Sequence, residues 1–289
     1  MQDTYQIRRP CLYLVGTPIG NLLDFTMRAK LTLSHVDCIL AEDTRKSRTL
    51  LDFYKIKTKM RSFHNWNENR DAKRTAIELK KHDLAYALIS DAGMPQISDP
   101  GFMLVKSCID MGVDVTTIPG PSALTAAVSL SNLPLNKFVF EGFLPRQKGK
   151  RYKELLRLKR ETRGMIFFEA PHRILGFLKS VEEVFGQDRL IIVARELTKT
   201  FEACYRGSIV EIYSKLSKSS SECKGEFTVI LSGEEAPQND SEELIRWLNI
   251  LLKYMDMKDA RYVLREFGLF KRNMIYENTK KKVDLFKKN

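Results

Sequence analysis

The sequence predicts an α/β protein whose strands form a mainly parallel sheet, most clearly in its first half. Short apolar runs alternate with amphipathic segments, which is the pattern of strands joined by helices. Several of these runs end in clusters of Gly, Pro, Ser and Asp, as loops at the carboxyl ends of parallel strands do. The 289 residues are enough for two domains, each with its own core. We therefore expect the functional groups on these loops.

In the first half, the apolar runs and the segments between them define the elements in order. Strands are predicted at 12–15, 38–41, 84–89 and 113–118. Helices are predicted at 26–34, 47–54, 69–81 and 101–111. In the third of these helices, the side chains expected to face the sheet are Ala72, Ala76, Ile77 and Leu79. This alternation of strands and helices favours parallel strands.

A second unit begins near residue 121, where a helix of small residues follows Pro119 and Gly120. Its strands are predicted at 138–142, 165–168, 190–194 and 227–231. Its helices are predicted at 121–129, 152–160 and 174–185. Two polar segments are predicted as loops, the basic stretch 144–151 and the Ser- and Lys-rich stretch 215–224.

Residues 234–289 differ in character from the two α/β units. A polar linker precedes a helix over 242–254, for which Ser241 is the expected N-cap. Two further helices, 256–267 and one from about 271, flank Gly268 and are similar to a helix-turn-helix. After residue 240 there are 12 Lys and Arg against 7 Asp and Glu. We predict an N-terminal α/β domain (1–120), a C-terminal α/β domain (121–233) and a helical, basic extension (234–289).

The net charge is +12, from 48 Lys and Arg against 36 Asp and Glu. This surplus favours polyanionic partners such as nucleic acid, although a generally lysine-rich proteome has the same effect on charge. No apolar run approaches the length of a membrane span, and residues 1–10 lack the apolar core of a signal peptide. The five cysteines form no Cys-x-x-Cys pair, and the four histidines form no i, i+4 pair. We expect a cytoplasmic protein with reduced thiols, no membrane association and no metal.

Several strand-end loops carry groups from which a site could be built. Gly16–Asn21 lacks the spacing of dinucleotide-binding and Walker phosphate loops. Ile89–Gly101 contains two Ser-Asp pairs, two glycines and two prolines, which suits a rigid loop rich in backbone amides. Glu42–Arg45 and Arg195–Leu197 place charges at strand ends, where they serve either function or buried ion pairs. His64–Glu68 reads as a polar loop whose tryptophan either packs in the core or stacks on a base.

Taken together, these loops carry the motifs of a known family. The motifs are Val15–Asn21, Ala41–Arg45, His64-x-x-Asn67-Glu68, Ile89–Gly101, Pro119–Ala123, Glu141–Pro145, Glu169-x-Pro171-His172-Arg173, Arg195–Lys199 and Gly225–Thr228. In this order and spacing, residues 11–280 resemble the small-subunit ribosomal RNA methyltransferases of the tetrapyrrole methylase superfamily. One difference is Met94, where that family usually has Thr.

The resemblance implies 2′-O-methylation of the ribose of a cytidine in the decoding region of 16S ribosomal RNA, with S-adenosyl-L-methionine as the methyl donor. It also implies two α/β domains, the second with a mixed sheet, a donor bound between them, and a homodimer. The partner is then 16S ribosomal RNA or the small ribosomal subunit. By correspondence of motifs, the donor-binding residues are Ile19, Asp91, Met94, Ser122, Ala123, Ala170, Leu197 and Thr228. Small and apolar side chains suit an adenine and a sulfonium better than a triphosphate, which favours Lys, Arg and Mg²⁺ ligands.

A ribose hydroxyl is a poor nucleophile near neutral pH, so a positioned base would assist methyl transfer. The candidates are Asp43, Glu68 and His64, with Glu68 and Asp43 preferred and His172 less favoured. The expected RNA contacts are cations for phosphates and aromatic rings for bases. The cations are Arg45, Arg146, Lys148, Lys150, Arg151 and Arg173, and the aromatic residues are Trp66 and Phe143.

Two other functions fit parts of the same sequence. A tetrapyrrole (precorrin-type) methyltransferase would share the fold and the donor, but a small macrocycle requires neither the +12 charge nor the basic stretch 146–151. A catalytically inactive ribosome-binding factor would keep the fold without a donor pocket. The complete set of Gly, Ser and Asp residues in Ile89–Gly101 and Pro119–Ala123 argues against such a loss. Titration with S-adenosyl-L-methionine separates an enzyme from a binding factor.

Overall fold

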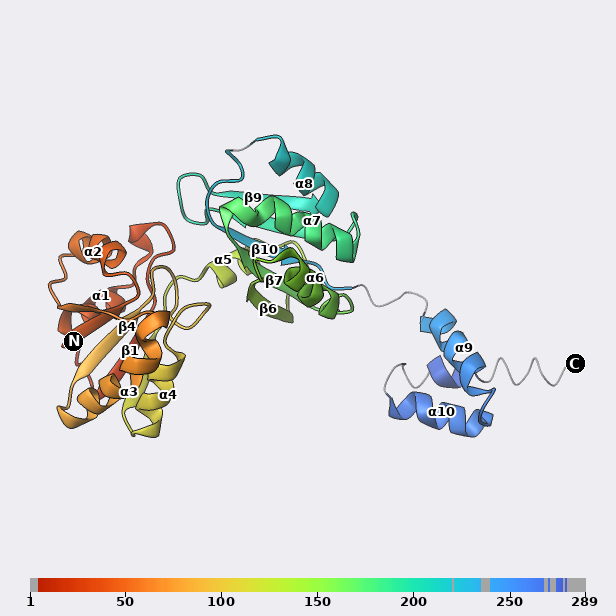
Figure 1. Cartoon of the computed structure of the whole chain (residues 1–289), viewed down its shortest axis with the longest axis horizontal. Helices are drawn as coiled ribbons and strands as arrows, with labels where there is room; N and C mark the ends of the chain where they lie inside the picture. Colours follow the sequence, from red (N-terminus) through yellow and green to blue (C-terminus); the bar gives the residue numbers. More distant parts are fainter. Residues whose placement is uncertain are drawn as a thin grey trace, which may run out of the picture. The chain divides into compact units, whose positions relative to one another are not determined.

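The computed structural model of the chain describes residues 5–219, 221–234, 240–267, 270, 274–277 and 279. The chain divides into two compact units, Met1–Gly233 and Glu234–Asn289 (Figure 1). The first unit contains two five-stranded sheets, one parallel and one mixed, with helices packed on them. The predicted fold class is therefore confirmed: two α/β sheets with a helical extension.

The first sheet is entirely parallel and has the strand order β3-β2-β4-β1-β5. Its strands are β1 (Cys11–Val15), β2 (Cys38–Ala41), β3 (Met60–Ser62), β4 (Ala85–Ile89) and β5 (Asp114–Ile118). Its helices are α1 (Met27–His35), α2 (Thr44–Phe53), α3 (Asn65–Lys81) and α4 (Phe102–Asp110), with a short 3₁₀ helix at Leu22–Asp24. Because the strands are parallel, the loops after β1, β2, β4 and β5 leave the sheet at one edge.

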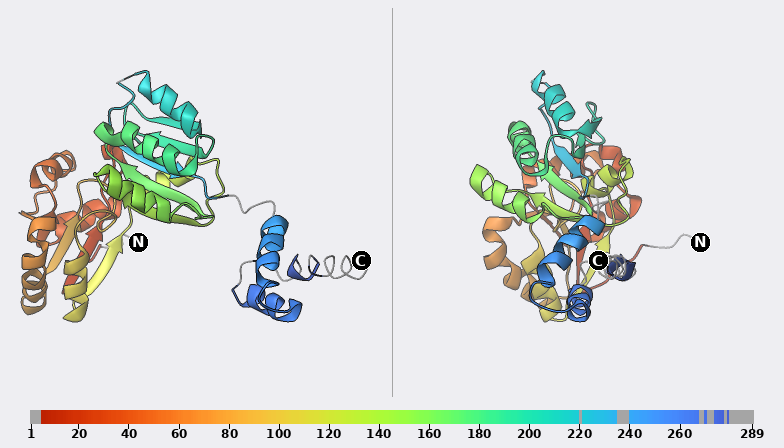
Figure 2. Two further views of the ribbon diagram at one scale, coloured as in Figure 1. Left: turned by 45° about the vertical axis from the view of Figure 1, so that its right-hand side comes forward. Right: turned by 90° about the vertical axis from the view of Figure 1, so that its right-hand side faces the viewer.

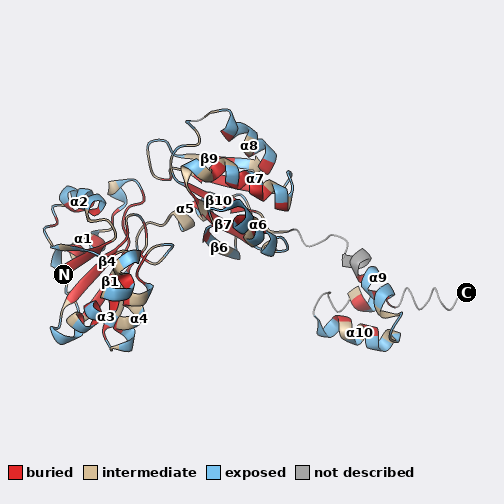
Figure 3. Ribbon diagram, in the orientation of Figure 1, coloured by how far each residue is buried: buried red, intermediate tan, exposed pale blue. Residues whose placement is uncertain are grey.

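Both faces of this sheet are buried, which explains the continuous apolar runs (Figure 3). Tyr13 and Val15 face the core formed with α1 and α2, whereas Leu12 faces the core formed with α3 and α4. Ile77 of α3, which we expected to face the sheet, is 47% exposed, and Thr75 is buried in its helix instead.

The second sheet is mixed, with the order β6-β7-β10-β8-β9, in which only β6 and β7 are parallel. Its strands are β6 (Phe138–Phe143), β7 (Gly164–Glu169), β8 (Leu190–Arg195), β9 (Ala203–Ser208) and β10 (Phe227–Leu231). Its helices are α5 (Ala123–Ser129), α6 (Lys148–Arg157), α7 (Ile174–Phe185) and α8 (Ile209–Ser217), and a 3₁₀ turn spans Pro171–Arg173. Helices α6, α7 and α8 build one core with the sheet, and α5 packs on the opposite core (Figures 1 and 2).

The second unit contains α9 (Asp240–Leu251), α10 (Met257–Glu266) and a helical turn at 274–277. Its core consists of Leu244, Leu248, Ala260, Leu264 and Ile275. Asp256 caps α10, because its Oδ1 accepts hydrogen bonds from the amides of Lys258 and Asp259, both at 2.8 Å. Gly268, the predicted turn residue, lies outside the described residues.

Five elements differ from the sequence prediction. The edge strands β3 and β9 were not predicted, because they are short or half-exposed and lack a clear apolar run. Helix α8 was not predicted either, and its last turn lies in the stretch 215–224 that we expected as a loop. His64–Glu68 is not a loop but the start of α3, where the Asn67 side chain accepts a 2.8 Å hydrogen bond from the His64 amide. Residues 148–151, expected in a loop, form the first turn of α6.

Candidate active site

A cavity of about 380 Å³ lies between the carboxyl-edge loops of the first sheet and the second sheet. This volume is within the range of small-molecule sites. All eight residues predicted to bind the donor line it: Ile19, Asp91, Met94, Ser122, Ala123, Ala170, Leu197 and Thr228. The structure thus brings together residues from loops that are far apart in the sequence. Their role in donor binding stays a prediction.

On the side of the first sheet, the cavity wall consists of loops that are hydrogen-bonded to one another. The Thr17 amide donates to the Gly93 carbonyl at 2.9 Å, and the Gly93 amide donates to the Thr17 carbonyl at 3.1 Å. Gly16 donates to the Ile118 carbonyl at 3.1 Å, and a Cβ on Gly16 would lie only 2.8 Å from Gly120. The loops after β1, β4 and β5 therefore form one closely packed platform under the cavity.

The long loop after β4 is anchored at its far end by Glu68. The Glu68 Oε1 atom accepts hydrogen bonds from the amides of Gly101 (3.0 Å) and Met103 (2.8 Å) at the start of α4. Glu68 is nearly buried and does not line the cavity. Its carboxylate therefore has a structural role in the loop.

One end of the cavity is acidic, with Glu42, Asp91 and Asp99 in its lining. Asp91 is paired with Lys46 (Oδ2–Nζ, 2.8 Å), and its Oδ1 accepts a 3.0 Å hydrogen bond from the Asp43 amide. Burial, reinforced by the charge of Glu42, raises the pKa of Asp99 to about 7. Burial, reinforced by the charge of Asp91, also raises the pKa of Glu42.

The second sheet supplies an aromatic wall and one buried carboxylate. The rings of Phe143 and Phe168 lie 5.6 Å apart, and both residues line the cavity. Glu169 Oε1 accepts a 2.8 Å hydrogen bond from the Ala170 amide and lies 3.1 Å from Arg173 Nε. Glu169 Oε2 is buried and has no hydrogen-bond partner among the described residues, and burial raises the pKa of this carboxyl.

The three predicted bases do not line the cavity. Asp43 is the N-cap of α2, and its Oδ1 accepts a 2.9 Å hydrogen bond from the Arg45 amide, which lowers the pKa of Asp43. His64 precedes α3, with Nδ1 buried and unpartnered among the described residues. The structure adds four carboxylates to the cavity, each within a motif that carried another candidate: Glu42, Asp99, Glu169 and Glu226.

Most of the predicted RNA-contact residues are at the surface. Trp66 is 95% exposed and the Arg45 side chain is 91% exposed. Phe143 is 54% exposed at the cavity. Arg146, Lys148 and Lys150 are exposed as well, although Lys148 pairs with Glu183 at 2.8 Å. These side chains are available to a large polyanion.

The prediction that Arg151 contacts RNA is wrong, because its guanidinium is buried and joins two helices. Only 7% of the residue is exposed. Its Nε donates to Ser180 Oγ at 3.0 Å, and Nη2 donates to the Gly176 carbonyl at 3.1 Å, which joins α6 to α7. The structure does not support Arg151 as a phosphate contact. Arg173 is similar, since Nη2 donates to the Leu144 carbonyl at 2.6 Å and its side chain is 13% exposed.

We expect Arg151→Ala to lower the free energy of unfolding by about 1–3 kcal/mol, because its loss leaves buried acceptors without a donor. Lys150→Ala, the neighbouring exposed position, is expected to change it by less than about 0.5 kcal/mol. Urea unfolding of both variants measures the difference. Equal stability of the two would contradict the buried role of Arg151.

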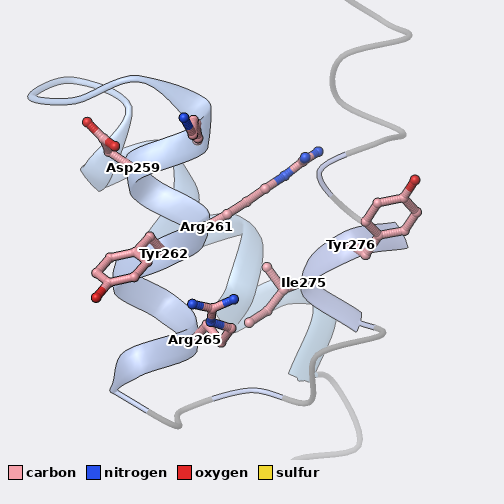
Figure 4. Close-up of a pocket in the computed structure, with 7 residues that line it drawn as sticks. Asp259, Arg261, Tyr262, Arg265, Ile275 and Tyr276 are labelled. Atoms are coloured by element: carbon pink, nitrogen blue, oxygen red, sulfur yellow. The ribbon is translucent and has the colours of Figure 1, made fainter.

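A separate cavity of about 370 Å³ lies in Glu234–Asn289 (Figure 4). It is lined by Lys258, Asp259, Arg261, Tyr262, Arg265, Ile275 and Tyr276. The Arg261 guanidinium lies 5.7 Å from the centre of the Tyr276 ring. None of the predicted site residues contributes to it, so the cavity between the two sheets is the candidate active site.

The described part of the chain contains neither a candidate metal site nor a helix that could span a membrane. Among these residues, no group of His, Cys, Asp and Glu is arranged to hold a metal ion. Among the helices described there, none is both long and apolar enough to cross a membrane.

Comparison of the sequence with known proteins gives consistent results. Residues 11–213 match the family described as Tetrapyrrole (Corrin/Porphyrin) Methylases. The chain is 48% identical over 224 residues to the Ribosomal RNA small subunit methyltransferase I of Thermotoga maritima, covering 78% of this chain and 99% of that protein. It is 40% identical over 270 residues to the protein of the same name from Vibrio cholerae, covering 93% of both.

Solved structures show the same fold at low sequence identity. Uroporphyrin-III-C-methyltransferase from Thermus thermophilus superposes with a TM-score of 0.52 at 16% identity, covering 78% of this chain and 94% of that chain. A cobalt precorrin-4 methyltransferase superposes with a TM-score of 0.54 at 14% identity, covering 77% and 95%. The two-sheet architecture of residues 5–233 is therefore shared with these enzymes.

Proposed function

Because the chain belongs to the tetrapyrrole (corrin/porphyrin) methylase family, we propose that it is an S-adenosyl-L-methionine-dependent methyltransferase that acts on ribosomal RNA. In its finer form, the proposal is 2′-O-methylation of a cytidine ribose in the decoding region of 16S ribosomal RNA. The observation that carries it is the convergence of all eight predicted donor-binding residues on one cavity. A cytoplasmic homodimer belongs to the same proposal and rests on the family resemblance alone.

The cavity has the chemistry that this donor requires. Ala123 and Ala170 leave room along its walls, and Ile19 and Leu197 supply apolar surface for an adenine. Glu42 and Asp91 supply negative charge for a sulfonium and an ammonium group. Glu169 Oε2 is a buried acceptor without a partner in the described structure, so it can receive a hydrogen bond from a bound ligand.

The bound donor supplies an electrophilic methyl group, so the main task of the protein is to align it with the attacking oxygen. The platform of loops after β1, β4 and β5 is suited to this task, because its hydrogen bonds fix the wall of the cavity. The aromatic wall formed by Phe143 and Phe168 lines the other side of the cavity.

The choice of RNA as the substrate is supported by the relatives and by the surface. Relatives that are 37–48% identical are named after the small ribosomal subunit RNA. The net charge is +12, and Arg45, Arg146 and Lys150 are exposed. The precorrin-type alternative is supported by the description of the family and by structures of 14–16% identity, and such structures show the fold alone.

The proposal is tested by mapping 2′-O-methyl groups in 16S ribosomal RNA from a strain with and without the gene. Primer extension at low nucleotide concentration is expected to stop at a cytidine of the decoding region only when the gene is present. Purified protein and S-adenosyl-L-methionine should restore the stop on small subunits from the deletion strain. An unchanged methylation pattern would overturn the proposal.

We expect the double variant Arg45→Ala/Arg146→Ala to bind the RNA substrate more weakly and with less dependence on salt. The slope of log K against log[salt] is negative, and each lost phosphate contact makes it shallower by about 1. The slope of the double variant should therefore be shallower than that of the wild type by about 2. Filter binding to small subunits between low and moderate salt measures the slope.

The control for this experiment removes the same charge elsewhere. Lys106→Ala/Lys179→Ala changes exposed residues of α4 and α7 that are not among the predicted contacts. Its salt slope should equal that of the wild type. If the salt dependence of RNA binding weakens equally in both double variants, then the overall charge of the protein explains the binding and specific contacts do not.

A further inference from the structure

We propose that the Asp99 carboxylate is the general base that accepts the proton of the substrate's ribose hydroxyl, and that Glu68 is the residue that positions it. The inference rests on the proposed function and adds a catalytic residue to the same cavity. Asp99 was not among the residues singled out in the sequence, where Asp43, Glu68 and His64 were the candidates.

Asp99 meets the geometric requirement, which those three residues do not. It lines the cavity and is half-buried, at the end of the loop between β4 and α4. The Ser90 side chain interacts with its carboxylate. A base must be within hydrogen-bond reach of the proton it removes, so a cavity-lining position is the first condition.

The loop that carries Asp99 is held rigidly. Gln96 and Ser98 have left-handed backbone angles (φ +70° and +67°), which non-glycine residues adopt only where the surroundings enforce them. The two hydrogen bonds from the Gly101 and Met103 amides to Glu68 fix the far end, two residues beyond Asp99. Glu68 therefore acts on the chemistry through the loop and not by contact with the substrate.

Except for Glu42, the other acidic groups that face Asp99 are paired with cations. Glu42, after β2, and Asp91, after β4, act on it through their charges. Asp91 is paired with Lys46 of α2. On the second sheet, Glu169 is tied to Arg173, and Glu226 pairs with Lys199 at 3.0 Å. Asp99 has no ion pair within the described part of the chain, and its pKa of about 7 is close to working pH.

One buried polar atom of the cavity wall indicates a ligand site, and this observation does not depend on Asp99. The Glu169 side chain is fully buried, and its Oε2 lacks a hydrogen-bond partner in the described structure. An unpaired buried carboxylate oxygen is costly unless a ligand supplies a donor. The cavity that Asp99 and Glu169 both line is therefore suited to a bound ligand.

Methyl transfer to the ribose hydroxyl needs only the donor, the substrate and Asp99. A lone pair of the ribose 2′ oxygen forms the new bond to the methyl carbon. The carbon–sulfur bond breaks, and its electron pair stays on sulfur, which becomes a neutral thioether. The hydroxyl proton passes to Asp99, which is afterwards a neutral acid and returns the proton to water. No oxidant, reductant or metal is needed.

The test is Asp99→Asn, which keeps the size of the side chain but cannot take the proton. Single-turnover methyl transfer to small subunits should fall by about 10²–10⁴-fold, the usual contribution of a general base. Donor affinity by calorimetry and particle affinity by filter binding should stay within about threefold of the wild type. Asp110→Asn, at an exposed position on α4, is the control and should transfer methyl groups at the wild-type rate.

The pH profile separates catalysis from a structural effect. The wild-type rate should rise with pH to a plateau, with an inflection near 7, where Asp99 loses its proton. Glu42→Gln removes a charge that raises this pKa, so its inflection should move to lower pH. Glu68→Ala should lower the rate. Glu68→Gln should keep most of the wild-type rate, because an amide oxygen also accepts hydrogen bonds from the amides of Gly101 and Met103.

Two results would overturn the inference. The first is an Asp99→Asn rate within threefold of the wild type. The second is a loss of donor affinity as large as the loss of rate, which would make Asp99 a donor-binding residue. Failure of the proposed function would appear differently, as absence of methyl transfer to small subunits by the wild-type protein itself.

Discussion

Replacing Gly16 with alanine is expected to weaken binding of S-adenosyl-L-methionine by about 5- to 150-fold. A Cβ there would lie 2.8 Å from the Cα and N atoms of Gly120 and 2.6 Å from Met94 Sδ. The contact with Gly120 is with backbone, so side-chain rotation cannot relieve it and the loops after β1 and β5 must separate. Overpacking of this kind costs about 1–3 kcal/mol, and about 1.4 kcal/mol is a factor of ten in affinity. Calorimetric titration with the donor measures the loss.

Gly149→Ala is the matched control for this variant. A Cβ at Gly149 would meet no atom within 4 Å, and the residue lies in α6, outside the cavity lining. It should bind the donor as the wild type does and be more stable by up to about 1 kcal/mol, the helix preference of alanine over glycine. Equal donor affinity of the two variants would show that the Gly16–Gly120 contact does not shape the donor site.

The parallel arrangement of the first sheet explains why the cavity could be predicted from the sequence. Parallel strands send their carboxyl ends to one edge of the sheet, so loops rich in Gly, Pro and Asp after successive strands must meet there. The family resemblance then indicated which residues of each loop face inward. Ile19, Asp91 and Ala123 lie in the cavity for this reason, although they come from loops about 30 to 70 residues apart.

The direction of individual charged side chains could not be predicted in the same way. The stretch before residue 152 has no apolar periodicity, so the start of α6 at Lys148 was not evident. Once the helix begins there, Arg151 faces α7, whereas Lys150 faces solvent. The polar residues around Glu68 predict a loop, in which its carboxylate is a candidate base. In the helix that actually forms, its carboxylate reaches the amides at the start of α4.

Arg173→Ala is expected to lower the free energy of unfolding by about 3–5 kcal/mol at neutral pH, the usual cost of removing one partner from a buried ion pair. Arg173 Nε lies 3.1 Å from Glu169 Oε1, and the two side chains are 13% and 0% exposed. The variant leaves the Glu169 carboxylate buried without its cation, and it also removes the hydrogen bond to the Leu144 carbonyl. Urea unfolding of the wild type and the variant measures the cost.

The loss should depend on pH with a definite sign. Burial already raises the pKa of Glu169, and the charge of Arg173 opposes that shift, so Arg173→Ala raises the pKa further. A carboxyl whose pKa is higher in the folded than in the unfolded protein makes stability fall as the pH rises between the two values. The variant should therefore lose more stability at pH 8 than at pH 5, where a protonated Glu169 tolerates burial.

Two companion variants distinguish this explanation from a simple loss of packing. Glu169→Gln removes the buried charge, so Arg173→Ala/Glu169→Gln should recover part of the stability at pH 8 and lose the extra pH dependence. Arg163→Ala breaks an exposed pair with Glu161, whose side chains are 48% and 18% exposed, and should cost at most about 1 kcal/mol. If Arg173→Ala costs no more than Arg163→Ala, or if its loss is greater at pH 5, then the Glu169–Arg173 pair does not stabilise this wall of the cavity.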